Sequence, residues 1–268
     1  MNPNQTPESD GQEDAPRPFL APCRIVPATA PFRWLAAGWK DLRAAPRQSL
    51  SWGLVVFSLS LSISTAAYAL GSLVMLLTMM SGFVLIGPLL AIALYTISWR
   101  LDRGRAPSFR RSTAEIRRQI GNCAVYALVL MVVFLVWARA GSMVHVFFPV
   151  EAEPDWRQLT TFLVIGSAVG SIFAAITFAA SAFSLPMLTD RQTDTVTAVV
   201  TSINAVLRNK PAMVVWMAII IFSVALGFAT GFLGLIVLFP LLGHATWHSY
   251  KDVIDASDWP PNEPMGLP

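Results

Sequence analysis

Apolar residues run along this chain in stretches longer than a helix of a soluble protein needs. Residues 48–99 contain no Asp, Glu, Lys or Arg, and neither do residues 120–138, 158–189 and 211–250. The hydrocarbon core of a bilayer is about 30 Å thick, and a helix needs roughly 20 apolar residues to cross it. The first and last stretches are each long enough for two such helices. The pattern therefore predicts an all-α membrane protein with six transmembrane helices.

Small and polar residues divide the longer stretches. Gly71 and Ser72 predict a turn in the first one, and Gly227, Thr230 and Gly231 predict a turn in the last. Turns at these points leave enough apolar residues on each side for a complete span. The expected transmembrane domain covers residues 32–251, with spans at residues 50–70, 73–97, 120–138, 160–187, 212–228 and 231–250.

The composition agrees with this division. Hydrophobic residues make up 54% of the 268 residues and charged residues only 13%, against about 25% in soluble domains. Residues 1–31 and 252–268 are rich in proline, which cannot continue a helix, and we expect them to be disordered tails. The cysteines, Cys23 and Cys123, are too few for a disulfide framework and are expected to be free thiols.

The three pairs of spans repeat a common unit. Apolar residues at helical spacing precede the first and third pairs, and Ser112 with Glu115 has the spacing of a capping box before the second. We expect three helical hairpins, each preceded by a short cytoplasmic amphipathic helix, with Asp194 or Thr195 as the N-cap of the third. The apolar positions are Phe32, Leu35, Trp39 and Leu42 before the first pair, and Val196, Val199, Val200, Ile203, Val206 and Leu207 before the third.

Local identities support the repeat. Residues 42–46 precede Trp52 as residues 207–211 precede Trp216, and both segments begin with Leu-Arg and end with Pro. A proline inside an apolar span removes a backbone hydrogen bond and kinks the helix. Each hairpin closes on a Pro-apolar-Leu triplet, beginning at Pro88, Pro186 and Pro240. The three helix kinks at these prolines are expected either to pack around a common centre or to serve only as bends.

Small residues recur at every fourth position of the fourth span, at Gly166, Gly170 and Ala174. Residues without large side chains let the backbones of two helices approach closely. We therefore expect this span to be the central packing helix, either within the monomer or at a dimer seam.

Basic residues gather in alternate loops and so predict the orientation. Cytoplasmic loops of membrane proteins carry an excess of Lys and Arg, which places both termini in the cytoplasm. The loop after the third span instead carries Glu151, Glu153 and Asp155 against Arg157. The basic loops contain Arg33, Lys40, Arg43 and Arg47 before the first span, seven arginines between residues 100 and 118, and Arg191, Arg208 and Lys210 after the fourth.

Four short segments are similar to a known family. They are Gly-Trp-Lys-Asp at residues 38–41, Gly-Pro at 87–88, Ser-Leu-Pro-Met-Leu-Thr-Asp-Arg at 184–191 and Gly-His-Ala-Thr-Trp-His at 243–248. With these segments the chain resembles domain of unknown function 2189, a family of predicted integral membrane proteins of proteobacteria. The likeness covers residues 30–251. It implies a bacterial inner-membrane location and no established reaction.

Some relatives in that family carry a loose label linking them to subunit I of cytochrome c oxidase. Haem-copper oxidase cores, as they are known, need more histidine ligands than the 3 of this chain, His145, His244 and His248. In the expected topology His145 lies outside, whereas the other two lie near the cytoplasmic face. The histidine count therefore excludes a catalytic oxidase core.

His244 and His248 are candidate metal ligands. Residues four apart share one face of a helix, and two imidazoles there suit a Zn or Cu ion if other helices add ligands. Further ligands at that side of the membrane are Asp190, Asp194 or Cys123. The alternative is that both histidines lie at the headgroup level in an aromatic and polar interfacial belt with neighbouring Trp247 and Tyr250.

The spans contain almost no ionisable residue, and no motif of a soluble enzyme is recognisable. Asp190 is expected to cap the helix that follows the fourth span. We expect a protein without enzymatic activity or cofactor, structural or accessory to a larger membrane complex. The alternatives are a small-solute or lipid transporter-like protein and a metal-binding or oxidase-associated accessory protein. Expected partners are membrane lipids and either such a complex or a second copy of the chain, with no nucleic acid.

Overall fold

In the computed structural model of this chain, the structure of residues 18–69, 87–106, 120–147 and 156–262 is described. These residues form helices and no strand, as expected for an all-α protein. The helices are α1 (Ala30–Ala44), α2 (Pro46–Ala69), α4 (Ile92–Asp102), α6 (Ile120–Phe147), α7 (Trp156–Ser181), α8 (Ser184–Asp190), α9 (Thr195–Arg208), α10 (Lys210–Ala229) and α11 (Leu235–Val253).

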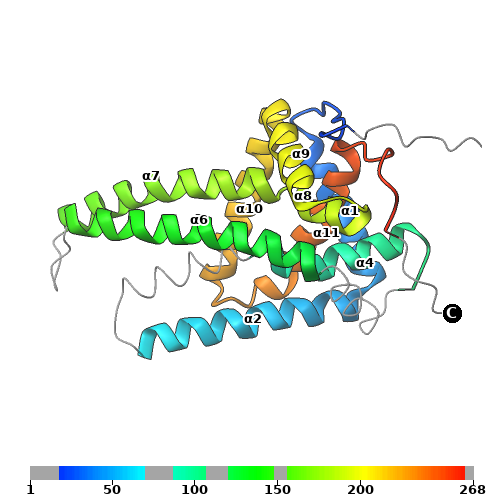
Figure 1. The fold of residues 1–268 in the computed structure, drawn as a ribbon. Helices are drawn as coiled ribbons and strands as arrows, with labels where there is room; N and C mark the ends of the chain where they lie inside the picture. Colours follow the sequence, from blue (N-terminus) through cyan, green and yellow to red (C-terminus); the bar gives the residue numbers. More distant parts are fainter. Residues whose placement is uncertain (1–17, 70–86, 107–119, 148–155, 263–268) are drawn as a thin grey trace, which may run out of the picture.

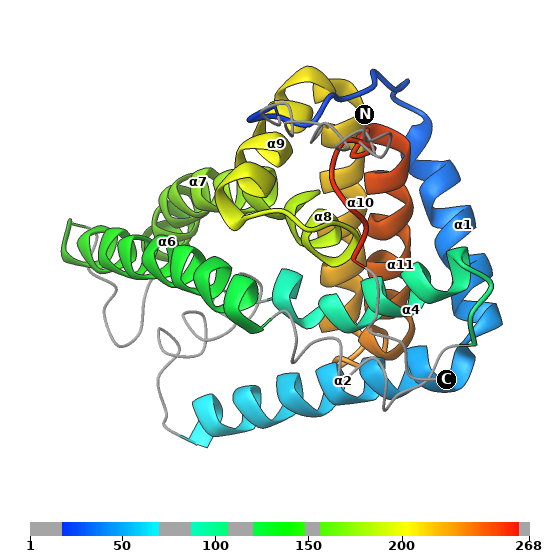
Figure 2. The same ribbon diagram turned by 45° about the vertical axis from the view of Figure 1, so that its right-hand side comes forward.

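Helix α11 lies at the centre of the packed part of the molecule. It contacts α1, α2, α4, α8 and α10, and Figure 2 shows α1 and α10 running along its two sides while α4 crosses it. The chain reverses between α10 and α11 at the turn predicted around Thr230 and Gly231. Gly231 there has a positive φ of 59°, a backbone conformation that costs glycine little because it has no Cβ atom.

Two glycines bring neighbouring helices against the backbone of α11. A Cβ atom on Gly38 of α1 would lie 2.7 Å from the backbone nitrogen of Ala245 and 2.9 Å from the carbonyl oxygen of Leu241. A Cβ atom on Gly53 of α2 would overlap the carbonyl group of Ile236. Such close approach is possible only where a side chain is missing. The central packing helix is therefore α11, and glycines of its neighbours fit around it.

Helices α6 and α7 lie side by side and extend away from this bundle (Figure 1). Their apolar side chains are largely exposed, and a Cβ atom on Gly166 would meet no other atom within 4 Å. The fourth span is therefore not the central packing helix within the monomer. Glycine spacing predicted a tight contact along this helix, but in the described structure α7 packs chiefly against α6 along one side and against α8 and α9 at one end.

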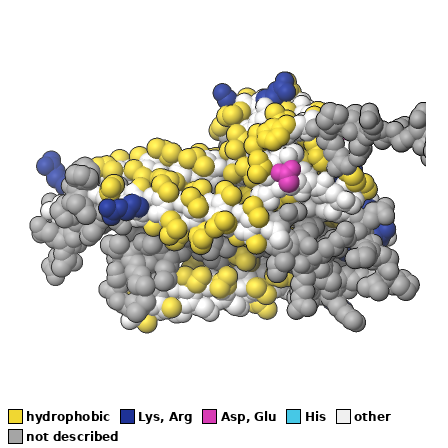
Figure 3. Space-filling view, viewed as in Figure 1, with side chains coloured by type: hydrophobic (Ala, Val, Ile, Leu, Met, Phe, Trp, Pro, Cys, Tyr) yellow, Lys and Arg dark blue, Asp and Glu magenta, His cyan; other side chains and the backbone are white. Residues whose placement is uncertain are grey.

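The predicted apolar stripes of α1 and α9 are exposed only in part, because Leu42 is buried and Val199 and Val206 pack against the core. Phe32 of α1 is 61% exposed and Val196 of α9 is 58% exposed, and Figure 3 shows apolar side chains covering the face formed by α6, α7 and α9. The face of α9 that packs inward carries hydroxyl groups. Ser202 donates to the carbonyl oxygen of Ala179 at 2.7 Å. In lipid, apolar side chains gain nothing by facing inward, so hydrogen bonds and close packing decide which face is buried.

Among the described residues, four helices are long and apolar enough to cross a membrane. These are the regions Pro46–Ala66, Ala124–Gly141, Trp156–Asp190 and Lys210–Ala229. They coincide with the first, third, fourth and fifth predicted spans. The second predicted span lies partly outside the described residues, and the sixth corresponds to α11. The arrangement as six spans in three hairpins thus stays a prediction.

The first and last described segments pair with each other. Cys23 and Ile254 form an antiparallel bridge, and the backbone N–H of Arg24 donates to the carbonyl oxygen of Val253 at 2.8 Å. Trp259 is also buried. The expectation of disordered tails therefore does not hold for residues 18–31 and 252–262. Residues 18–29 and 254–262 are not helical, as their prolines predicted, but they pack against the rest of the structure. Residues 1–17 and 263–268 lie outside the described structure.

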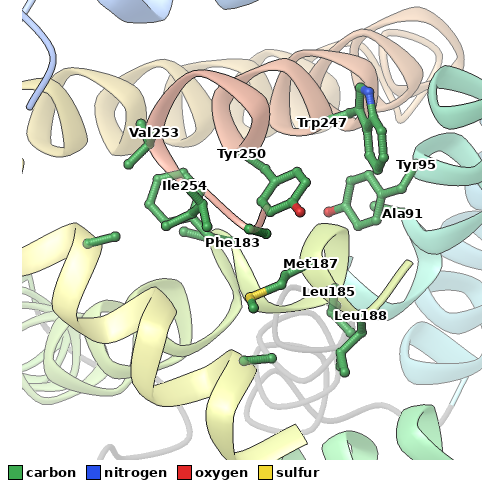
Figure 4. Close-up of a cluster of buried hydrophobic side chains, with 14 of the residues drawn as sticks. Ala91, Tyr95, Phe183, Leu185, Met187, Leu188, Trp247, Tyr250, Val253 and Ile254 are labelled. Carbon is green, nitrogen blue, oxygen red and sulfur yellow. The ribbon is translucent and has the colours of Figure 1, made fainter. Parts of the chain in front are cut away.

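The apolar core lies where the C-terminal half of α11 meets α8 and the start of α4. Figure 4 shows Tyr250, Val253 and Ile254 facing Phe183 and Met187, with Tyr95 beside Trp247. These side chains are almost fully buried. The core holds the ends of α4, α8 and α11 in one arrangement, and the polar groups described below depend on it.

Replacing Gly53 by alanine tests the central role of α11. We expect Gly53→Ala to lower the free energy of unfolding by about 1–3 kcal/mol, because the new methyl group overlaps the Ile236 carbonyl. Gly166→Ala is the matched control. It should be neutral or stabilising by up to about 1 kcal/mol, since its methyl group enters open space and alanine favours a helix. Thermal unfolding in detergent would measure both, and equal effects would contradict the assigned packing.

Candidate functional site

His244 is fully buried between two serines from different helices. Its Nε2 lies 2.8 Å from the hydroxyl oxygen of Ser49 on α2, and its Nδ1 lies 2.8 Å from that of Ser98 on α4. The exposed fraction of His244 is 0%. Both ring nitrogens therefore have protein partners, as a buried imidazole requires. This contact joins α2, α4 and α11 through side chains.

Asp41 of α1 continues the hydrogen-bond chain to His248. The hydroxyl of Ser98 donates to Oδ2 of Asp41 at 2.6 Å, and Nε2 of His248 lies 2.8 Å from the same oxygen. Burial by itself raises the pKa of the Asp41 carboxyl, but hydrogen bonds from His248 and Ser98 outweigh it and hold the pKa below its usual value. Asp41 is therefore the ionised acceptor at which the chain converges.

The ionised carboxylate gives the hydrogen bonds a direction. A serine hydroxyl has one hydrogen, and that of Ser98 is donated to Asp41. Ser98 must then accept from Nδ1–H of His244, which leaves Nε2 to accept from the Ser49 hydroxyl. This is the pattern of a neutral imidazole, the form that suits a site closed to solvent. The chain of hydrogen bonds thus runs from Ser49 through His244 and Ser98 to Asp41. The carboxylate of Asp41 also accepts a hydrogen bond from His248.

The structure brings the two predicted site residues into one cluster, but with partners other than those expected. The ring nitrogens of His244 lie against serine hydroxyls, and His248 lies against Asp41. Among the described residues, no group of three or more His, Cys, Asp or Glu side chains is placed to hold a metal ion. A metal at His244 and His248 would need ligands from elsewhere and would displace these hydrogen bonds.

The other expected placements differ as well. Trp247 and Tyr250 are buried, so they do not form an interfacial belt around the two histidines. The N-cap of α9, by contrast, is one of the two predicted residues: it is Asp194, whose side chain accepts from the backbone N–H of Thr197 at 2.9 Å. Asp190 does not cap this helix. The side chains of His145 and Cys123 lie outside the described structure.

Asp190 instead forms ion pairs with three basic side chains at the end of α8. Its side chain is 0% exposed, and its carboxylate lies 3.2 Å from the guanidinium of Arg103, 3.3 Å from that of Arg191 and 3.2 Å from the ammonium of Lys251. The Tyr250 hydroxyl also donates to it at 3.0 Å. A buried carboxylate needs this compensation. The cluster fastens the ends of α4, α8 and α11 to one another.

Sequence reasoning missed Asp41, Ser49 and Ser98. A signal was present for Asp41, because Trp34, Gly38 and Asp41 share one helical face, and that face is the buried one. The apolar residues Phe32 and Trp39 indicated that the opposite face would be buried, but that face is exposed. For the serines the sequence offers no signal, since uncharged hydroxyl residues are common in apolar helices.

A cavity of about 240 Å³ lies on the opposite side of α11 from the hydrogen bonds of His244. It is formed by α2, α4 with the residues just before it, α7, α10 and α11. Its lining is almost entirely apolar and contains no charged side chain. Pro88 lines it, whereas the matching residues Pro186 and Pro240 do not, so the three prolines do not converge on this cavity. The hydroxyl residues in the lining are Tyr95, Thr177, Ser181 and Thr246.

Comparison with known proteins confirms the family resemblance over part of the chain. A family model described as "Predicted integral membrane protein (DUF2189)" matches residues 75–190. The matched region includes residues 87–88 and 184–190, whereas residues 38–41 and 243–248 lie outside it. No curated protein and no solved structure matches the chain. Together with its long apolar helices, the match identifies a predicted integral membrane protein.

Removing the Ser98 hydroxyl tests how much this chain of hydrogen bonds contributes to stability. We expect Ser98→Ala to lower the free energy of unfolding by about 1–3 kcal/mol, because it leaves Nδ1–H of His244 buried without a partner. Ser62→Ala is the control on α2. The Ser62 hydroxyl is exposed and bonds only to the carbonyl oxygen of Ser58, so the change should stay within about 0.5 kcal/mol. Similar values for both variants in a detergent unfolding assay would contradict the proposed chain.

The lowered pKa of Asp41 makes stability depend on pH at the acid end. A carboxyl whose pKa is lower in the folded state stabilises the protein above the unfolded pKa, near 4, and this contribution is lost as pH falls through the folded value. We expect the Tm of the wild type to fall more steeply below about pH 4 than that of Asp41→Asn. Asp258→Asn, at an exposed position, should keep the wild-type profile. Parallel profiles for Asp41→Asn and the wild type would contradict the assignment.

Proposed function

We propose that this protein is a non-enzymatic integral membrane protein that holds an apolar molecule, such as part of a lipid acyl chain, in the cavity beside α11. The cavity is the observation that supports this proposal. Its volume of about 240 Å³ is somewhat below the roughly 300–1,000 Å³ of typical ligand sites. A space of this size suits a segment of a chain or a small apolar molecule better than a complete lipid.

The lining of the cavity favours a lipid over a polar solute. Trp216, Phe228 and Phe239 supply large apolar surfaces, and neither an acid nor a base lines the cavity. A strongly polar solute would find only a few hydroxyl groups in this lining, and leaving its remaining groups without hydrogen-bond partners is costly in an apolar environment. Of the transporter-like functions, lipid handling is therefore the better supported.

The position of the cavity also supports this function. Residues of five helices meet around it, and sites between the helices of a bundle are common places for ligands. Helix α11 contributes Leu242 and Gly243 to the cavity, and the next residue, His244, to the hydrogen-bond chain. Any movement of α11 on ligand binding would thus act on both.

We further propose that both termini lie on the cytoplasmic side of a bacterial inner membrane. The pairing of Cys23 with Ile254 supports a common side for the two ends of the described chain. Four candidate spans among the described residues, an even number, are consistent with this. The basic loops and the excess of Lys and Arg expected in the cytoplasm supply the direction.

An accessory role in a membrane complex is a further proposal for the pair α6 and α7. Leu128, Leu135 and Val164 are among the exposed apolar side chains of these helices. They suit contact with lipid and contact with another membrane helix equally. Co-purification of a stoichiometric partner would favour the accessory role over lipid contact alone.

Filling the cavity tests the proposed function. We expect Val224→Trp to reduce labelling of the buried cavity residues Trp216 and Leu235 by a diazirine-bearing hydrocarbon about fivefold, because the indole occupies the cavity that Val224 lines, whereas lipid-facing residues should be labelled as before. Labelling would be measured by mass spectrometry of peptides from α7, α10 and α11 after irradiation in nanodiscs. Labelled positions should include cavity residues of several helices.

Val214→Trp is the matched control for this experiment. Val214 lies on the same helix, is 67% exposed and does not line the cavity. The control variant should keep the wild-type labelling of cavity peptides. Equal labelling of the wild type and Val224→Trp would contradict the proposed function.

A further inference from the structure

We propose that the surface where α1 meets α2 binds the headgroup of an anionic phospholipid. Its phosphate would lie against Lys40, Arg43 and Arg47, with the Trp39 ring beside it. We call these four residues the junction site. They lie on the outer surface of the bundle, so lipid binding there does not depend on what the cavity beside α11 holds.

Helix α1 has one face against α11 and one face free. Gly38 and Asp41 are buried on the inner face. Trp39 is 38% exposed on the outer face, and Lys40 and Arg43 are exposed beside it. The guanidinium of Arg43 lies 5.1 Å from the centroid of the Trp39 ring, within the range of a cation–π contact. The outer face of α1 therefore ends in an aromatic ring that is flanked by positive charge.

The cations of the junction site are not neutralised by the protein, unlike other exposed arginines nearby. The guanidinium groups of Arg24 and Arg33 each lie 3.2 Å from a carboxylate, that of Asp255 and that of Asp252 respectively. In the described part of the chain, no ion pair joins a cation of the junction site to an acidic side chain. Their positive charge is therefore available to an anion from outside the chain.

The position of the junction site selects a lipid as the source of that anion. Helix α1 ends at Ala44, and the first candidate span begins at Pro46. The end of a membrane-spanning helix lies near the lipid headgroups, where tryptophan is enriched and basic side chains attract anionic lipids. A phospholipid offers its phosphate to the cations and its acyl chains to the indole ring. A soluble anion would use only the charge.

The charge of the junction site favours an anionic headgroup over a zwitterionic one. Phosphatidylcholine carries a quaternary ammonium group next to its phosphate, and this group is repelled by the basic side chains. Phosphatidylglycerol carries the phosphate without a cation. One Lys or Arg near an anionic membrane surface strengthens binding about fivefold. The two lipids, with identical acyl chains, are therefore the probes that distinguish a charge-selective site from ordinary contact with the bilayer.

Native mass spectrometry of the delipidated full chain with these two lipids tests the junction site. For the wild type we expect phosphatidylglycerol to bind about tenfold more tightly than phosphatidylcholine. Lys40→Gln/Arg43→Gln should weaken the binding of phosphatidylglycerol about tenfold and leave that of phosphatidylcholine unchanged, because it removes two unneutralised cations. Both side chains are exposed, so the fold should tolerate the change.

Arg24→Gln/Arg33→Gln is the matched control. It removes the same number of exposed cations, but each of these is paired with a carboxylate. Its preference for phosphatidylglycerol should stay within about twofold of the wild type, since a neutralised cation attracts a headgroup weakly. The excess of basic residues that orients a membrane protein depends on their number rather than on such pairing. An equal loss of preference in the two double variants would therefore overturn the junction site.

Two further results would also overturn it. One is equal binding of the two lipids to the wild type. The other is displacement of phosphatidylglycerol by inorganic phosphate at constant ionic strength, which would show that a free anion is the occupant. Should the double variant fail to fold, Lys40→Gln and Arg43→Gln, each expected to bind phosphatidylglycerol about fivefold more weakly, are compared with Arg33→Gln. Failure of the cavity labelling experiment would leave the junction site unaffected.

Discussion

Gly38 and Gly53 allow α1 and α2 to lie directly against the backbone of α11, and the other features of the bundle depend on that distance. In lipid, van der Waals packing and hydrogen bonds between helices replace the hydrophobic effect as the source of association. With a larger residue at either position, α1 or α2 would move outward. Ser49 and Asp41 would then leave hydrogen-bonding distance of His244 and His248. The glycine contacts are therefore a geometric condition for the buried polar chain.

Helix α11 separates two environments of opposite character. Gly243 lines an apolar cavity, whereas the neighbouring His244 lies in a chain of hydrogen bonds that ends at an ionised carboxylate. Successive residues of a helix point about 100° apart, so one helix can serve both sides. The ion cluster around Asp190 fixes the far end of the same helix through Tyr250 and Lys251. Consequently α11 is held at several points while it forms one wall of the cavity.

Much of the local structure could be predicted from the chain, whereas the buried faces could not. Apolar length predicted α2, α6, α7 and α10, and the N-cap at Asp194 was among the predicted choices. The stripe of Phe32 and Trp39 in α1 was equally visible, but it faces outward and the face of Trp34 and Asp41 is buried. Apolar periodicity identifies an inner face only where water surrounds the protein. In a membrane protein, lipid receives apolar side chains as readily as a core does.

The sequence by itself determined the class of the protein, its longest helices and the positions where helices begin, because bilayer thickness, proline and capping residues act locally. The tertiary structure alone decided that α11 rather than the fourth span lies at the centre. It also placed Ser49, Ser98 and Asp41 around His244 and His248, and left an apolar cavity beside α11. These features join residues that lie far apart in the chain, so only the close approach of whole helices brings them together.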